Sequence, residues 1–277
     1  MEGRAHKKRA LLDWLASRKG CIVAFSGGID SSFLLYMARK ALGRDRVLAV
    51  LARSESLKTR DYDFARAFCR RYDVVLKVVY TRELDDERYS SNPVDRCYVC
   101  RGHLYRALNE LKQGYPGFDV LNGTNADDLS DYRPGNRAAA DFQVFSPLVD
   151  CGITKAELRE MAQAAALPNY DMPASPCMST RIPYHQVVTR EKLAQIEAAE
   201  ASLNRMGFRD VRVRHYGKMA RVEVEKAMLG RLKELEPGVR EAIARLGFDR
   251  VEIDEEGLVS GKMNRKMEKE DGKGIVL

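Results

Sequence analysis

Residues 26–32, SGGIDSS, constrain this chain more than any other stretch because of what flanks them. The apolar run CIVAF at 21–25 leads into them, and the helical pattern FLLYMARKAL follows. A strand, a glycine-containing loop and a helix in this order present backbone N–H groups and the positive end of a helix to an anion. Gly27 and Gly28 let the backbone approach that anion closely. The stretch therefore predicts a phosphate-binding loop within an α/β sheet.

Two features refine the ligand expected in this loop. A carboxylate is a poor direct partner for phosphate, so Asp30 predicts a bound Mg²⁺, which prefers oxygen ligands. The chain has no GxxxxGK[ST] sequence, so the loop is not the common P-loop. The alternative is a tight strand-to-helix turn in which the glycines and Ser26, Ser31 and Ser32 serve geometry alone.

The first half of the chain alternates apolar runs with helical patterns. The runs are nearly continuous, as in parallel strands covered on both faces, and they lie at 21–25, 47–52, 74–80 and 118–124. Helices are predicted at 31–42, 58–71, 99–112 and 154–167, with a weaker fifth strand at 144–149. The pattern predicts an α/β fold, a doubly wound, Rossmann-like parallel sheet, over residues 1–186.

The chain changes character after this alternating region. Residues 168–187 contain four prolines and little periodicity, which predicts a loop or linker, and long ordered loops are often functional. Within residues 187–277 a helical run followed by two short β-type runs occurs twice. We therefore expect a small α+β domain built from two helix–hairpin units.

The segment GTNADD, 123–128, ends the fourth predicted strand. Ligands bind at the carboxyl ends of the strands in such sheets. Gly123 and either Thr124 or Asn125 are therefore expected at the nucleotide, and Asp127 and Asp128 in the Mg²⁺ shell. An Asx-rich turn is the alternative.

Charge argues against a nucleic-acid partner. Residues 1–186 carry 28 basic and 23 acidic side chains, and residues 187–277 carry 19 and 17, so neither part is strongly basic. No apolar run approaches the length of a membrane span, and the basic N-terminus lacks a signal-peptide core. We expect a cytoplasmic protein with no membrane partner.

The pair Cys97 and Cys100 in DRCYVCRGH has three possible roles: a metal site, a redox disulfide, or reduced and inert thiols. Cys177 in the proline-rich linker offers a third thiolate. Soft thiolates suit iron and zinc alike, and His103 or His185 would supply a fourth zinc ligand. Cys21, Cys69 and Cys151 are expected to pack as small hydrophobes.

The SGGIDSS loop in its strand–helix context resembles that of the PP-loop ATPases, which include NAD synthetase, GMP synthetase, asparagine synthetase and tRNA-thiolation enzymes. The resemblance implies ATP cleavage between the α- and β-phosphates, an adenylated substrate and pyrophosphate in the loop. It also implies that the region after the second strand, where Ser54 lies, receives the adenosine.

Together with GTNADD, the segments DYRPG (131–135) and PASPCMSTRIPYH (173–185) resemble the LarE family of sulfur transferases of nickel-pincer nucleotide cofactor synthesis. The resemblance covers essentially the whole chain. It implies a pyridinium-3,5-dicarboxylic acid mononucleotide substrate, one carboxylate of which is adenylated and then converted to a thiocarboxylate. It also implies a homo-oligomer built through the C-terminal domain.

The family uses two sulfur sources. One sacrifices the cysteine that matches Cys177, leaving dehydroalanine; the other uses sulfide on a [4Fe-4S] cluster held by three cysteines and recharged by a small sulfur donor. With Cys97, Cys100 and Cys177 present, this sequence fits the cluster version. A sacrificial Cys177, a tRNA-thiolation enzyme and an ATP-binding module with a structural zinc stay open as alternatives.

Four charged residues are further candidates. Arg181 follows Cys177 closely and is expected to neutralise a phosphate or the charge developing on the acyl-adenylate. Arg212 and Arg214 alternate in VRVRH and so share one strand face, which the resemblance places near the substrate phosphate. Glu200 matches a family residue near the sulfur site. A solvated strand face for the arginines and a surface position for Glu200 are the alternatives.

Overall fold

The structure, a computed structural model, describes residues 2–129, 134–173, 175–259 and 262. It divides into two compact units. The first comprises Met1–Tyr89 and Val94–Ser175, and the second Ser90–Pro93 and Pro176–Leu277. No helix in the described parts of the chain is both long and apolar enough to cross a bilayer.

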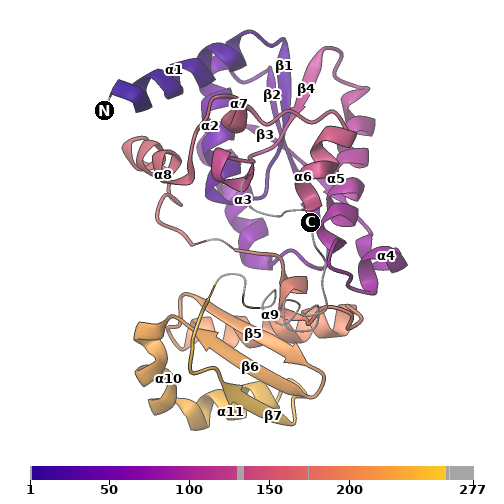
Figure 1. Cartoon of the computed structure of the whole chain (residues 1–277), viewed down its shortest axis with the longest axis vertical. Coiled ribbons are helices and arrows are strands. Elements are labelled where there is room, and N and C mark those ends of the chain that lie inside the picture. Colours follow the sequence, from indigo (N-terminus) through magenta and orange to yellow (C-terminus); the bar gives the residue numbers. More distant parts are fainter. Residues whose placement is uncertain (1, 130–133, 174, 260–261, 263–277) are drawn as a thin grey trace, which may run out of the picture. The chain divides into compact units, whose positions relative to one another are not determined.

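The first unit contains a four-stranded sheet in which every neighbouring pair is parallel. The strand order is β3-β2-β1-β4 (Figure 1). The strands are β1 (Gly20–Ala24), β2 (Val47–Arg53), β3 (Val75–Tyr80) and β4 (Phe118–Leu121). The chain thus adds β2 and β3 on one side of β1 and β4 on the other, which makes the carboxyl ends of β1 and β4 the switch point where ligands bind in such sheets.

Helices cover both faces of this sheet. Cys21 and Val23 of β1 belong to one apolar cluster, together with residues of α1, α2, α3 and α8, whereas Ile22 belongs to a second cluster with residues of α5 and α6. The helices are α1 (Glu2–Ala16), α2 (Ile29–Leu42), α3 (Thr59–Arg71), α4 (Glu87–Ser90), α5 (Arg96–Lys112), α6 (Pro134–Asp141), α7 (Pro147–Asp150) and α8 (Lys155–Ala164). The predicted doubly wound α/β fold is confirmed.

The predicted fifth strand at 144–149 is wrong except at one position. Phe145 forms a single parallel bridge with Leu121, and its N–H donates to the Val120 carbonyl at 2.9 Å. The chain then turns into α7, because Pro147 lacks an N–H for a sheet ladder and is well suited to the first turn of a helix.

The second unit packs helices against a three-stranded mixed sheet of order β5-β6-β7. Its elements are α9 (Arg190–Arg205), β5 (Val211–Tyr216), β6 (Met219–Val224), α10 (Leu229–Glu234), α11 (Glu236–Ala244) and β7 (Arg250–Ile253). The first predicted hairpin, β5–β6, is antiparallel as expected, but β7 pairs parallel to β6. Residues 254–259 contain no strand, so the second predicted hairpin is wrong.

Candidate functional site

The loop between β1 and α2 leaves backbone donors for an anion. Gly28 occupies the N-cap position of α2, so no N-cap side chain accepts a hydrogen bond from the first turn of this helix. The N–H groups of a first helical turn have no partner within the helix, so an anion can accept from them. Gly27 has a φ of 78°, a conformation that favours glycine.

The carbonyl groups of this loop are bonded elsewhere. The Gly28 carbonyl accepts from Ser31 Oγ at 3.0 Å and from the Ser32 N–H at 2.9 Å. Ser26 Oγ lies 3.2 Å from Ser31 Oγ and accepts from the Gly28 N–H at 3.3 Å. The loop is thus held by neutral hydrogen bonds.

The segment after β4 lies against this loop. A Cβ on Gly123 would come within 2.8 Å of the Ser31 nitrogen, so the two backbones touch. Asn125 Nδ2 donates to Asp30 Oδ1 at 3.2 Å, and Thr124 is buried with its N–H donating to Asn122 Oδ1 at 3.0 Å. The structure therefore brings SGGIDSS and GTNADD together at the switch point of the sheet.

The three aspartates of these segments do not form a bare acidic cluster. Asp30 is ion-paired with Lys155, a residue to which sequence reasoning assigned no role. Asp127 Oδ2 accepts from the Lys155 N–H at 2.8 Å, and Asp128 Oδ2 accepts from the Asn125 N–H at 3.1 Å. Nucleotide-bound Mg²⁺ usually takes one or two carboxylates and several waters. Asp30 and a neighbouring aspartate fit that donor set if the Lys155 ammonium moves off Asp30.

Ser54 follows β2, as predicted. Its hydroxyl lies 3.0 Å from Ser56 Oγ, and its carbonyl accepts from the Leu57 N–H at 3.2 Å. The serine thus belongs to a local turn at the carboxyl end of the sheet, and its contact with adenosine stays a prediction.

Cys97 lies on the first turn of α5 and Cys100 on the next. Three residues apart on a helix, they share one face; Cys97 is exposed and Cys100 half-buried. Cys100 Sγ donates to Glu83 Oε1 at 3.5 Å. The positive end of the helix favours negative charge at this place, which suits thiolate ligands. Within the described residues no group of three or more His, Cys, Asp or Glu side chains is placed to hold a metal.

The two histidines considered as zinc ligands have different surroundings. His103 Nε2 lies 3.0 Å from Asp86 Oδ2. Arg88 above all, and His103 next, hold the pKa of Asp86 well below its usual range. His185 is exposed, has a φ of 64° and donates its N–H to the Asn92 carbonyl at 2.9 Å.

Cys21 and Cys69 are buried, as predicted, and Cys151 is half-buried. Burial raises the pKa of both Cys21 and Cys69 to about 12. These two thiols therefore keep their protons at neutral pH.

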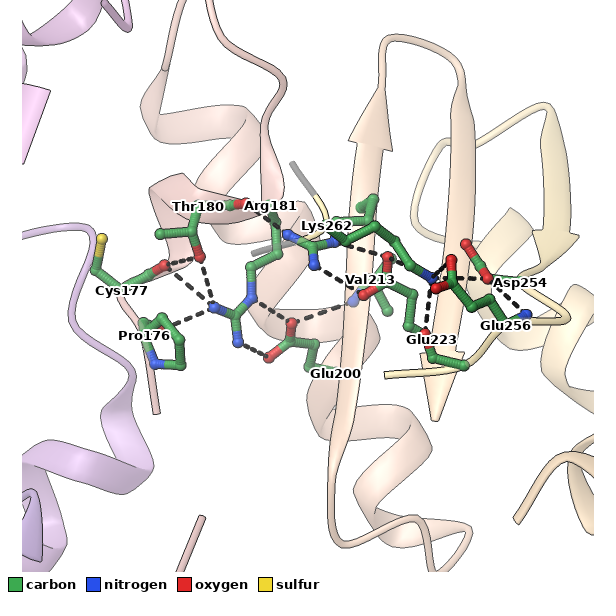
Figure 2. A network of polar contacts seen from close by, with 12 residues as sticks. Pro176, Cys177, Thr180, Arg181, Glu200, Val213, Glu223, Asp254, Glu256 and Lys262 are labelled. Atoms are coloured by element: carbon green, nitrogen blue, oxygen red, sulfur yellow. Dashed lines mark hydrogen bonds and ion pairs between the residues drawn. The ribbon is translucent and has the colours of Figure 1, made fainter. Parts of the chain in front are cut away.

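Cys177 belongs to the second unit, where hydrogen bonds hold its backbone in place (Figure 2). Its carbonyl accepts from Thr180 Oγ1 at 2.8 Å, from the Thr180 N–H at 3.1 Å and from Arg181 Nη1 at 3.2 Å. Arg181 Nη1 also donates to the Pro176 carbonyl at 2.7 Å. The side chain of Cys177 is half-buried.

A buried ion pair holds Arg181 in place. Arg181 is 1 % exposed and Glu200 3 % exposed; Arg181 Nε donates to Glu200 Oε1 at 2.8 Å, and that oxygen also accepts from the Val213 N–H at 3.1 Å. Glu200 is therefore not the surface residue considered as an alternative. The structure brings together Cys177, Arg181 and Glu200, and the contacts of Arg181 run to the linker and to Glu200.

Arg212 and Arg214 share a face of β5 but differ in their contacts. Arg214 makes a bidentate contact to Glu223 at 3.0 and 2.8 Å, and its Nη1 donates to the Thr180 carbonyl at 2.7 Å. Arg212 is half-buried; desolvation, followed by the charges of Arg181 and Arg214, lowers its pKa. Arg181 and Arg214 are each paired with a buried glutamate, so Arg212 supplies the net positive charge that favours an anion at this place.

Sequence reasoning missed four residues that organise these sites. Lys155 pairs with Asp30, Asn169 bonds the anion loop, and Glu223 pairs with Arg214. Lys262 donates to Asp254 Oδ1 at 2.8 Å, which extends the network of Figure 2. The partners of Lys155 and Asn169 lie more than 100 positions away, so no local pattern marks these two residues. Glu223 and Lys262 have partners nine and eight positions away, and the fold of the second unit brings each of them to its partner. Of the motif DYRPG, residues 131–133 lie outside the described residues.

Comparison with known proteins places these features in context. The family described as NAD synthase matches residues 12–89. The pyridinium-3,5-bisthiocarboxylic acid mononucleotide synthase of Lactiplantibacillus plantarum is 34 % identical over 265 residues, which cover 96 % of each chain. An uncharacterised protein of Synechocystis is 36 % identical over 250 residues, 90 % of this chain and 93 % of that protein. An NH₃-dependent NAD⁺ synthetase of Pyrococcus furiosus is 27 % identical over 55 % of this chain and 59 % of its own length.

Proposed function

Since the chain belongs to the LarE family of pyridinium-3,5-bisthiocarboxylic acid mononucleotide synthases, within the NAD synthase and PP-loop ATP pyrophosphatase superfamily, we propose that it inserts sulfur into a pyridinium dicarboxylic acid mononucleotide. The chain is an ATP-dependent PP-loop enzyme. The observation that carries the proposal is the 34 % identity over 96 % of both chains, which extends beyond the nucleotide loop to the linker and the second unit.

The reaction needs ATP because a carboxylate is a poor electrophile. A ring carboxylate oxygen attacks the α-phosphorus of ATP and pyrophosphate leaves. A sulfur nucleophile then attacks the acyl carbon and AMP leaves, which gives a thiocarboxylate. In this proposal the loop formed by Ser26, Gly27, Gly28, Ser31 and Ser32 binds the pyrophosphate through the N–H groups of α2, and Asp30 with a neighbouring aspartate holds Mg²⁺.

We assign the nucleotide chemistry to residues 1–186. Residues 187–277 take the substrate phosphate through Arg212 and Arg214 and supply the contacts of a homo-oligomer. Desolvation, followed by the charges of Arg181 and Arg214, lowers the pKa of Arg212, and this supports the phosphate assignment because an anion there would stabilise the charged form. Arg181 and Glu200 act by fixing the backbone on each side of Cys177.

We assign the sulfur to a [4Fe-4S] cluster held by Cys97, Cys100 and Cys177. Thiolates are the usual ligands of such clusters, and two of these cysteines stand one helical turn apart. A cluster bound by these three thiolates would supply sulfide as the nucleophile and would be recharged by a small sulfur donor. The chain itself contributes Cys97 and Cys100 at the start of α5 and Cys177 in a linker whose backbone is held by hydrogen bonds.

Anaerobic turnover tests the function. Wild-type protein is mixed with Mg²⁺, ATP and pyridinium-3,5-dicarboxylic acid mononucleotide, and AMP, pyrophosphate and thiocarboxylate are measured. All three should form in the wild type, and C177A should still release pyrophosphate but form no thiocarboxylate. The proposal fails if the wild type does not cleave ATP with this substrate, or if it thiolates tRNA instead.

Metal analysis and mass spectrometry separate the sulfur sources. Anaerobically purified protein should contain iron and sulfide in equal amounts, and C97A should lose both while still binding ATP. Dehydroalanine at residue 177 after turnover would favour the sacrificial route. A single zinc per chain without iron would overturn the cluster.

A further inference from the structure

Asn169, in the proline-rich linker, reaches back to the anion loop. Its Nδ2 donates to the Gly27 carbonyl at 2.9 Å and to Ser32 Oγ at 2.9 Å. Both partners and Asn169 itself belong to the first unit, and Asn169 is 1 % exposed. The linker segment that leads to Cys177 is thus bonded to the loop.

The orientation of the Asn169 amide follows from its partner. A carbonyl oxygen only accepts hydrogen bonds, so the Asn169 atom facing Gly27 is Nδ2. The other amide atom, Oδ1, is buried and has no hydrogen-bond partner among the described residues. An acceptor buried without a donor costs stability. Asn169 is therefore a poor choice for packing alone.

The bond to Gly27 also fixes the next N–H group. In a planar trans peptide the carbonyl and the following N–H point in opposite directions. With its carbonyl bonded to Asn169, Gly27 directs the Gly28 N–H to the other side, where it meets Ser26 Oγ. A carbonyl turned toward that side would repel an anion.

We propose that Asn169 is a positioning residue of the pyrophosphate site, which keeps the Gly27 carbonyl turned away from the bound anion and the Gly28 N–H turned toward it. This inference rests on the proposed pyrophosphate role of the loop. It makes the first-unit segment around Asn169 a part of the ATP site, because the loop is competent for pyrophosphate only while this segment lies on it.

Three variants separate the positioning role from a structural one. N169A removes the shorter of the two hydrogen bonds to the Gly27 carbonyl and leaves that from Ser32 Oγ at 3.3 Å. N169D replaces the donor with a carboxylate that cannot donate and that adds negative charge beside the loop. Ser175→Ala is the matched control, because Ser175 lies in the same linker and its Oγ donates to Asp61 Oδ2 at 2.7 Å without touching the loop.

Calorimetric titration of the full chain with inorganic pyrophosphate and Mg²⁺ is the test, with melting temperatures measured with and without pyrophosphate. We expect N169A to weaken pyrophosphate binding about 10-fold and N169D more than about 100-fold, and S175A to bind like the wild type. The melting temperature of ligand-free N169A should stay near that of the wild type, while its rise on adding pyrophosphate shrinks.

Two results would overturn the inference and are distinguishable. If the wild type binds pyrophosphate and N169A binds it equally well, Asn169 has no positioning role, while the proposed function stands. If the wild type itself does not bind pyrophosphate, the loop is not the pyrophosphate site and the inference falls with it.

Discussion

The anion loop of the first unit and the charged network of the second hold their functional groups in opposite ways. The loop is fixed by neutral hydrogen bonds among serines, glycine carbonyls and Asn169. The network is fixed by buried ion pairs, Arg181 with Glu200 and Arg214 with Glu223. A loop of this kind can take up and release a charged ligand without exposing a buried charge, whereas each member of the network depends on its partner.

The largest expected effect tests that dependence. Glu200→Gln removes the counter-charge of buried Arg181 and should lower the free energy of unfolding by about 3–5 kcal/mol. Urea denaturation measures it. Glu241→Gln, in the exposed pair of Glu241 with Arg245, is the control and should change stability by about 0.5 kcal/mol or less. If Glu200→Gln lowered the free energy of unfolding as little as the control does, the buried network would not depend on its ion pairs.

The next effect concerns the contact between the two backbones at the anion loop. Ala in place of Gly123 would put a Cβ 2.8 Å from the Ser31 nitrogen, and such overpacking costs about 1–3 kcal/mol. Because the displaced backbone is that of the loop, pyrophosphate affinity measured by calorimetry should fall at least about 10-fold. Gly230→Ala, with open space around its Cβ position in α10, should gain up to about 1 kcal/mol of stability and leave affinity unchanged.

The loop contains one ion pair, and removing it sharpens the contrast with the network. Lys155→Met leaves Asp30 unneutralised near the anion site, so the affinity for pyrophosphate measured without Mg²⁺ should fall about 5-fold, or about 1 kcal/mol. The pair is partly exposed, so the melting temperature should hardly change. Lys218→Met removes the same charge from an exposed position in the second unit and should leave affinity unchanged. The difference in pyrophosphate affinity between the two variants should shrink at high salt. A difference of the same size at high salt would argue against a charge effect.

The smallest effect is a pH dependence of the second unit. Burial, followed by the charge of Lys192, lowers the pKa of His215 below its ordinary value of 6.5. The unfolded chain therefore binds the proton more readily than the folded one, so this contribution to stability is full above pH 6.5 and is lost as pH falls below it. The urea concentration at the unfolding midpoint should decrease as the pH falls from 8 to 5.5. His215→Gln should reduce this dependence of the midpoint on pH. Equal slopes would contradict the assignment.

The sheet and its helices could be predicted from sequence because their signal is local. The apolar runs around Val23 and Val50 appear as buried strands close to their predicted limits. The failures occurred where one residue or a distant partner decides. Pro147 converts the expected fifth strand into a helix start, and β7 pairs parallel to β6 instead of forming its own hairpin.

The site divides in the same manner. The strand–loop–helix context of SGGIDSS indicated the anion loop, since that context is contiguous. Lys155 and Asn169 contact the loop from more than 100 positions away, and neither stands in a recognisable motif. The buried state of Glu200 likewise depends on Arg181 and Val213, which only the folded second unit brings to it.

Three of the six cysteines fall into two classes of chemical reactivity. Cys21 and Cys69, with pKa values of about 12 and buried side chains, are shielded from alkylating reagents at neutral pH. Cys97 is open to the same reagents. Footprinting with an alkylating probe would therefore report two events in one spectrum: protection of Cys97 would follow occupancy of its site, and labelling of Cys21 or Cys69 would follow loss of the folded sheet.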